Sequence, residues 1–143
     1  MKTRKGVSAI IFVMDKRKRK YLLLRRKMYW TGWEWLKGGC RKGENEIACL
    51  EREIKEEIGK KVEDYIVTPT KMIFSFQYER PFVHDGELWK GAKNKVYLIE
   101  LNNKRIKIDK DEHSGFKWAS KADALKLITW PDQKKIFEKL TKN

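Results

Sequence analysis

The sequence has little of what marks a secreted or membrane-spanning protein. Only two of its 143 residues are cysteines, Cys40 and Cys49, and a chain of this length buries a core without disulfides. The two lie on either side of a predicted helix start, and nothing else indicates secretion, so we expect reduced thiols in a cytoplasmic protein. The first apolar run, GVSAIIFVM, is too short to span a bilayer and lacks a signal-peptide cleavage pattern. We therefore expect no membrane association.

Acidic residues are scarce relative to basic ones. The chain has 20 Asp and Glu against 34 Lys and Arg, a formal net charge of +14. Such a charge attracts polyanions, but it is equally the pattern of a solubilising surface. Its clearest cluster, DKRKRKY at residues 15–21, lies between two apolar runs and is typical of a solvated hairpin loop.

Hydrophobic periodicity predicts a single α+β domain over residues 1–143. The predicted elements follow one another without an internal repeat or linker. In chain order they are a hairpin of strands at 7–14 and 21–26, a Trp- and Gly-rich loop at 28–45, a helix from Asn45 to Ile58, strands at 65–78 and 94–101 separated by a loop, and two C-terminal helical segments, the second opened by Pro131.

The predicted helix at 45–58 carries an unusual group of carboxylates. Its apolar stripe is formed by Ile47, Leu50, Ile54 and Ile58. Glu53 and Glu57 lie about 40° apart beside that stripe, and Glu56 lies further round the same flank, with Arg52 one turn before it. Carboxylates crowded at the edge of a core repel one another, and a divalent cation relieves that repulsion. The alternative is a solvated acidic stripe paired with neighbouring lysines.

The loop before this helix favours the metal site. GGCRKGE and REIKEEIG together resemble the signature of the Nudix hydrolases, which cleave nucleoside diphosphates linked to another group. Lys60 stands where that signature has a large aliphatic residue. The matching positions are Gly38, Glu44, Arg52, Glu53, Ile54, Glu56, Glu57 and Gly59.

The resemblance implies an α/β/α sandwich with a mixed sheet and a loop–helix motif that binds Mg²⁺ or Mn²⁺. It implies Glu53, Glu56 and Glu57 as metal ligands beside Gly38. Arg52 would orient a carboxylate, and Glu44 would support the metal shell. Glu53, Glu57 and Arg52 are thereby candidate catalytic residues.

Three further segments are similar to the Nudix branch that acts on dinucleoside polyphosphates and RNA 5′ ends. They are WEWLKGG, with Leu36 in place of a proline, WKGAKNKVYLIEL, and EHSGFKW. The last implies Glu112 as a candidate base or additional metal ligand. His113 would position the segment around it. Candidate substrate-binding residues are the cations Arg26, Lys37 and Lys95 and the aromatics Tyr78 and Phe82.

The sequence leaves several activities open. The first hypothesis is metal-dependent hydrolysis of a dinucleoside polyphosphate such as diadenosine tetraphosphate. The alternatives are removal of pyrophosphate from an RNA 5′ end, hydrolysis of nucleoside triphosphates, and a non-catalytic nucleotide- or RNA-binding module. The expected partner is a nucleotide substrate, an RNA 5′ end remains open, and the oligomeric state is not predicted.

Overall fold

A seven-stranded mixed sheet forms the centre of the computed structural model, which describes residues 2–142. The strand order is β3-β2-β1-β6-β5, with β4 on β1 and β7 on β2; β1 and β6 are parallel, and the other pairs are antiparallel. The elements are β1 (Lys2–Asp15), β2 (Lys18–Arg26), β3 (Gly32–Glu34), β4 (Leu36–Gly39), α1 (Glu46–Ile58), the 3₁₀ turn η1 (Val62–Asp64), β5 (Tyr65–His84), β6 (Glu87–Leu101), β7 (His113–Ala119), α2 (Lys121–Leu127) and α3 (Pro131–Leu140).

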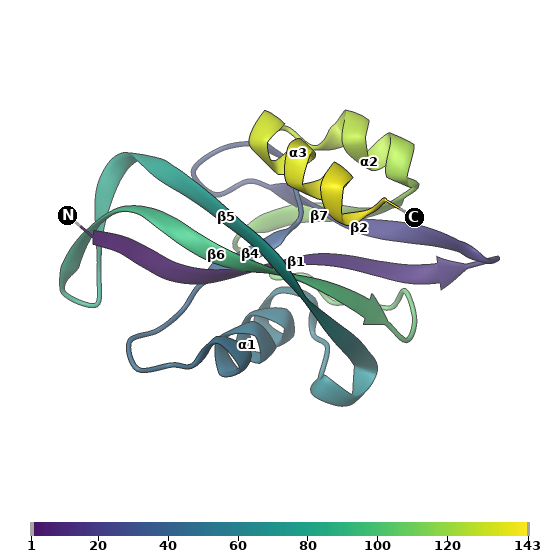
Figure 1. Ribbon diagram of the computed structural model, residues 1–143, viewed down its shortest axis with the longest axis horizontal. Helices are drawn as coiled ribbons and strands as arrows, with labels where there is room; N and C mark the ends of the chain where they lie inside the picture. The colour runs from purple at the N-terminus through teal and green to yellow at the C-terminus, as the bar shows by residue number, and fades with distance from the viewer. Residues whose placement is uncertain (1, 143) are drawn as a thin grey trace.

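Helices cover both faces of this sheet. Helix α1 lies on one face, and α2 and α3 lie together on the other (Figure 1). The central strand β1 is apolar on both sides because it sits between two cores. Val7 and Ile11 pack in the cluster that includes Leu50 of α1, whereas Ile10 packs in the cluster that includes Phe137 of α3. The predicted α/β/α sandwich is confirmed.

Helix α1 begins and ends as its sequence predicts. The Asn45 side chain accepts a hydrogen bond from the Ala48 amide at 2.8 Å, and Gly59 ends the helix in a left-handed conformation with φ of 71°. The predicted apolar stripe is wrong at one position, because Ile47 is 51% exposed. The buried arc is turned toward Glu53 and Glu57, which leaves Ile47 on its rim.

The two cysteines form a disulfide, so the prediction of reduced thiols is wrong. Cys40 follows β4, and Cys49 faces the core from α1, with 5.3 Å between their Cα atoms. The intervening loop turns back on itself to reach the start of α1, which brings together two side chains that sequence spacing alone left apart. The bridge ties the loop that follows β4 to the carboxylate helix.

The second hairpin is much longer than predicted. Strand β5 continues to His84 and β6 starts at Glu87, so the segment expected to be a loop is mostly paired strand. Asp85 and Gly86 make the two-residue turn, both with positive φ, of 52° and 74°. Asp-Gly is a strong signal for such a turn. The long hairpin, together with the start of β1, extends beyond the helices (Figure 1).

Over the described part of the chain, none of the helices combines the length and the apolar character that crossing a membrane requires.

Candidate active site

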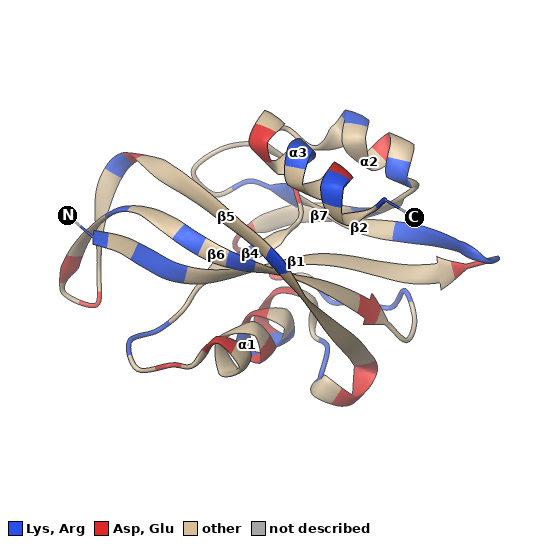
Figure 2. Cartoon of the chain, viewed as in Figure 1, with Lys and Arg blue, Asp and Glu red and all other residues tan. Residues whose placement is uncertain are grey.

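Two of the helix carboxylates are buried at the edge of the core. Glu53 is 7% exposed and Glu57 is 3% exposed, whereas the side chain of Glu56 is 46% exposed. Burial disfavours the charged form, and it raises the pKa of Glu53 to about 7 and that of Glu57 to about 8. Acidic residues mark α1, in contrast to the Lys and Arg that recur along β1, β2 and β6 (Figure 2).

Arg52 joins three carboxylates of the motif. Its Nε and Nη2 donate to the two carboxylate oxygens of Glu44 at 2.8 and 2.9 Å. Its Nη1 donates to Glu53 at 2.9 Å and to Glu56 at 3.2 Å, and Nη2 also donates to the carbonyl of Gly39 at 3.0 Å. The bidentate bond to Arg52 lowers the pKa of Glu44 to about 2. Arg52 therefore fixes the orientation of Glu53 and Glu56 and ties the loop to the helix.

Gly38 makes room for one of these carboxylates. A Cβ atom at residue 38 would overlap the carboxylate of Glu53. Only glycine lets Glu53 lie against the backbone of β4. Gly39, the next residue, leaves equivalent space for the guanidinium of Arg4.

A second set of charged groups faces α1 from the segment around β7. Carboxylate oxygens of Glu57 and Glu112 and a ring nitrogen of His113 lie within 4.8 Å of one another. The backbone carbonyl of Glu112 accepts hydrogen bonds from the amides of Lys27 at 3.0 Å and Met28 at 3.3 Å. The segment that carries Glu112 is thereby anchored to the end of β2.

His113 is buried between two carboxylates. Its Nε2 lies 2.9 Å from Glu34 and its Nδ1 lies 3.2 Å from Glu57. Burial opposes the charged imidazole, but the adjacent carboxylates of Glu34 and then Glu57 outweigh it and raise the pKa of His113 to about 9. Glu34, only 1% exposed, also faces Arg26 at 3.3 Å and Lys37 at 3.8 Å.

This donor set fits a divalent cation. The buried Oε2 of Glu57 lies 3.2 Å from Nδ1 of His113 but forms no well-aligned hydrogen bond among the described residues, and Glu112 lies beside it. Carboxylate oxygens are the ligands that Mg²⁺ and Mn²⁺ prefer. The residues able to hold such an ion are Glu53, Glu56, Glu57 and Glu112, next to the backbone of Gly38.

A groove of about 250 Å³ reaches two of these carboxylates, and most of the other charged side chains in its walls are basic. It is lined by Glu53 and Glu112 and by Arg4, Lys37, Arg41 and His84, among others. Burial lowers the pKa of Lys37, whose ammonium lies 4.3 Å from the ring centre of Phe76. From Phe76 a row of aromatic side chains continues along β5 through Tyr78 to Phe82. The rings of Tyr78 and Phe82 meet edge to face, with 4.6 Å between their centres.

The structure brings most of the predicted site residues together, but not all. Lys37 and Glu112 line the groove with Gly38, Arg52 and Glu53. Arg26 is mostly buried and held by Glu34 and by the Met28 carbonyl, at 3.3 and 3.0 Å. Lys95 does not reach the groove; its ammonium lies 3.8 Å from Glu46, at the start of α1.

Sequence reasoning missed three residues of this region. Arg4 lies in the part of β1 that precedes the predicted strand, and His84 lies in a segment expected to be a loop. Glu34 carried a usable signal, since it is an acid directly between two tryptophans. An acid in an apolar setting indicates a buried partner, which here is His113.

Comparison with known proteins assigns the chain to a family. The family model of the NUDIX domain matches residues 3–140, so the chain belongs to the Nudix hydrolases, enzymes that act on pyrophosphate bonds. The RNA pyrophosphohydrolase of Rickettsia peacockii (strain Rustic) is 30% identical to it over 120 residues, which are 78% of this chain and 72% of that protein.

Two solved structures share the fold. The Ap4A hydrolase of C. elegans, in a binary complex, superposes with a TM-score of 0.78 at 24% identity, covering 97% of this chain and 96% of that one. The dihydroneopterin triphosphate pyrophosphohydrolase of E. coli gives a TM-score of 0.75 at 19% identity, covering 97% of each chain.

Proposed function

We propose that the chain hydrolyses a phosphoanhydride bond of a dinucleoside polyphosphate, with diadenosine tetraphosphate as the representative substrate and Mg²⁺ or Mn²⁺ as cofactor. One observation carries the proposal. The buried, Arg52-held carboxylate of Glu53 lines one groove together with Glu112, and the other walls of that groove include the cations Arg4, Lys37 and Arg41. A polyphosphate chain needs both metal and basic side chains to offset its charge.

The metal-binding role falls to the carboxylates. Glu53, Glu56 and Glu57 would hold the ion, with Glu112 and the backbone of Gly38 beside it. A bound Mg²⁺ or Mn²⁺ would supply charge neutralisation and Lewis acidity. Arg52 and Glu44 hold these ligands in place through the bonds described above.

The hydrolytic step requires a proton acceptor. As the oxygen of water attacks phosphorus, the bridging P–O bond breaks and the water loses a proton. In this proposal the carboxylate of Glu112 accepts that proton, because it lies in the groove and its backbone is anchored by the amides of Lys27 and Met28. Glu57, which is partly engaged by His113, is the other carboxylate within reach.

Substrate recognition in this proposal is shared by cations and aromatic rings. Lys37 and Arg4 contact phosphate groups from the groove walls. Tyr78 and Phe82 lie further along the long hairpin and offer faces for a nucleobase, a contact worth roughly 1–3 kcal/mol. Arg26 is proposed to act indirectly, by holding Glu34.

An RNA 5′-triphosphate end is the second candidate substrate. The name of the Rickettsia relative favours it, and so does the net charge of +14, which suits a long polyanion. Both candidates present the same phosphate chain to the groove, and they differ in what lies beyond it.

A product assay with Mg²⁺ tests the proposal. Diadenosine tetraphosphate and a 5′-triphosphorylated oligonucleotide are incubated separately with the protein, and products are resolved by chromatography. We expect ATP and AMP from the first and no pyrophosphate or phosphate from the second. Pyrophosphate release from RNA alone would make the second candidate the function, and no turnover of either would contradict both.

A further inference from the structure

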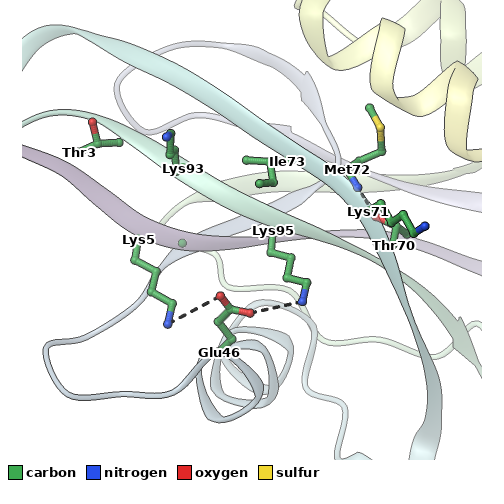
Figure 3. Close-up of a pocket in the computed structure, with 10 residues that line it drawn as sticks. Thr3, Lys5, Glu46, Thr70, Lys71, Met72, Ile73, Lys93 and Lys95 are labelled. Atoms are coloured by element: carbon green, nitrogen blue, oxygen red, sulfur yellow. Dashed lines mark hydrogen bonds and ion pairs between the residues drawn. The ribbon is translucent and has the colours of Figure 1, made fainter.

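A second, larger cavity lies on the sheet face that carries α1. Its volume is about 680 Å³, within the range of small-molecule sites. Strands β1, β5 and β6 and the first residue of α1 form its walls (Figure 3). Four of its lining residues are lysines, Lys5, Lys71, Lys93 and Lys95, and the one carboxylate in the lining, that of Glu46, faces Lys5 and Lys95.

An irregularity in β5 opens this cavity. Pro69 pairs with Tyr97, but the next β5 residue in register is Ile73, which pairs with Lys95. Strand β5 therefore uses two more residues than β6 over the same stretch and bulges away from it. The hydroxyl of Thr70 fixes the bulge, since it donates to the Val96 carbonyl at 2.6 Å and accepts from the Met72 amide at 3.1 Å.

The cavity is separate from the metal groove. Side chains alternate between the two faces of a strand, so Lys93 and Lys95 project on one face of β6 and the intervening Asn94 on the other. Asn94 is buried and donates to the Ser8 hydroxyl at 3.1 Å. The residues lining the cavity and those lining the groove have no member in common.

The lysines of this cavity are available to a ligand. The ammonium groups of Lys5 and Lys95 point toward opposite oxygens of Glu46, at 3.7 and 3.8 Å (Figure 3). Pairs this long and this exposed contribute little stability. Lys71 and Lys93 make no ion pair with any residue that the structure describes. The Glu46 carboxylate thus occupies the position between two cations that an anionic ligand would take.

We propose that this cavity binds a phosphate chain, of a nucleotide or of inorganic polyphosphate, without a divalent cation. Lys5, Lys93 and Lys95 supply the charge, and Thr3 adds a hydroxyl on the rim. The carboxylate of Glu46 competes with the ligand and weakens binding. The exposed side chain of Ile73 gives a base or ribose an apolar surface, but the phosphates carry the recognition.

Calorimetric titration in EDTA tests the proposal independently of turnover. The probes are ATP and inorganic tripolyphosphate, each titrated into the full chain at low ionic strength. We expect both to bind, and the double variant Lys93→Gln/Lys95→Gln to bind each at least tenfold more weakly. Glu46→Gln is expected to bind both about threefold to tenfold more tightly, because it removes the competing charge.

Matched controls separate a site from general attraction. Lys110→Gln/Lys117→Gln removes the same charge from exposed positions elsewhere and is expected to leave both affinities unchanged. Equal weakening by the two double variants, or unchanged binding in Lys93→Gln/Lys95→Gln, would overturn the proposal. So would a site that takes ATP and rejects tripolyphosphate. Loss of hydrolysis with Mg²⁺ is measured separately and bears only on the proposed function.

Discussion

At the scale of single residues, the most consequential feature is a buried chain of charges behind the candidate metal site. Glu34 lies between Arg26 and His113, and His113 continues the contact to Glu57. Three of these four side chains are under 5% exposed. In such an environment each charge depends on its partner, and removal of one leaves the others uncompensated.

Glu34→Gln tests this dependence. We expect the variant to lose about 3 kcal/mol of unfolding free energy, because His113 and Arg26 then face a neutral amide in a buried setting. Urea denaturation at neutral pH measures the loss. The control Glu63→Gln, on the exposed turn η1, is expected to change stability by less than about 0.5 kcal/mol. Equal stability of the two variants would show that the buried chain contributes nothing.

At the scale of elements, helix α1 lowers the stability of the fold when no metal ion is bound, because it buries charged carboxylates. Its face toward the core includes two carboxylates whose pKa values are raised by burial, to about 7 and about 8. Glutamates of the unfolded chain titrate near 4.5. Between pH 4.5 and the raised pKa values of Glu53 and Glu57, the folded protein therefore holds more protons than the unfolded one. Raised carboxyl pKa values therefore predict that stability falls as pH rises from about 4.5 to about 8.

A bound cation opposes this loss of stability with rising pH. We expect the melting temperature in EDTA to fall between about pH 6 and about pH 8.5, and Mg²⁺ to raise it more at the higher pH, where protons no longer compete. The raised pKa of His113, about 9, acts in the same direction, since its stabilising charge is lost as pH rises through that value. Scanning fluorimetry measures the effect. A Mg²⁺ shift that is larger at the lower pH would contradict it.

Sequence patterns predicted the positions of residues along α1 better than the contacts between strands of the sheet. Asn45, Gly59 and the helix period fix the positions of Glu53 and Glu57, because caps and periodicity are local. The sheet face onto which Lys95 projects depends on strand register, and the length of β5 depends on pairing with β6. The disulfide likewise depends on the path of a loop. These features are set by contacts distant in sequence.

At the scale of the whole molecule, the net charge is +14, and Lys and Arg recur along the strands, loops and C-terminal helices (Figure 2). The ion pairs within the candidate active site use part of this charge, and the rest creates a positive field over the surface. For a polyanionic substrate such a field accelerates encounter more than it changes the chemical step.

In the turnover of diadenosine tetraphosphate, we therefore expect kcat/KM to depend on salt concentration and kcat to be nearly independent of it. Raising KCl from low to well above physiological concentration should lower kcat/KM by roughly fivefold or more, because ions screen the field. The value of kcat should change little, since the bound substrate already lies among the site cations. Steady-state kinetics at several salt concentrations measure both. A kcat/KM that is independent of salt would show that the surface charge does not steer the substrate.

The most direct test of the central claim, a metal-dependent hydrolytic site on α1, is the turnover of Glu56→Gln. Glu56 is half-exposed, and within residues 2–142 its side chain bonds only to Arg52 and Arg41, so we expect the fold and melting temperature to be retained. With Mg²⁺, hydrolysis of diadenosine tetraphosphate is expected to fall at least a hundredfold, while Glu51→Gln on the same helix retains wild-type turnover. Near-normal turnover in Glu56→Gln would contradict the account.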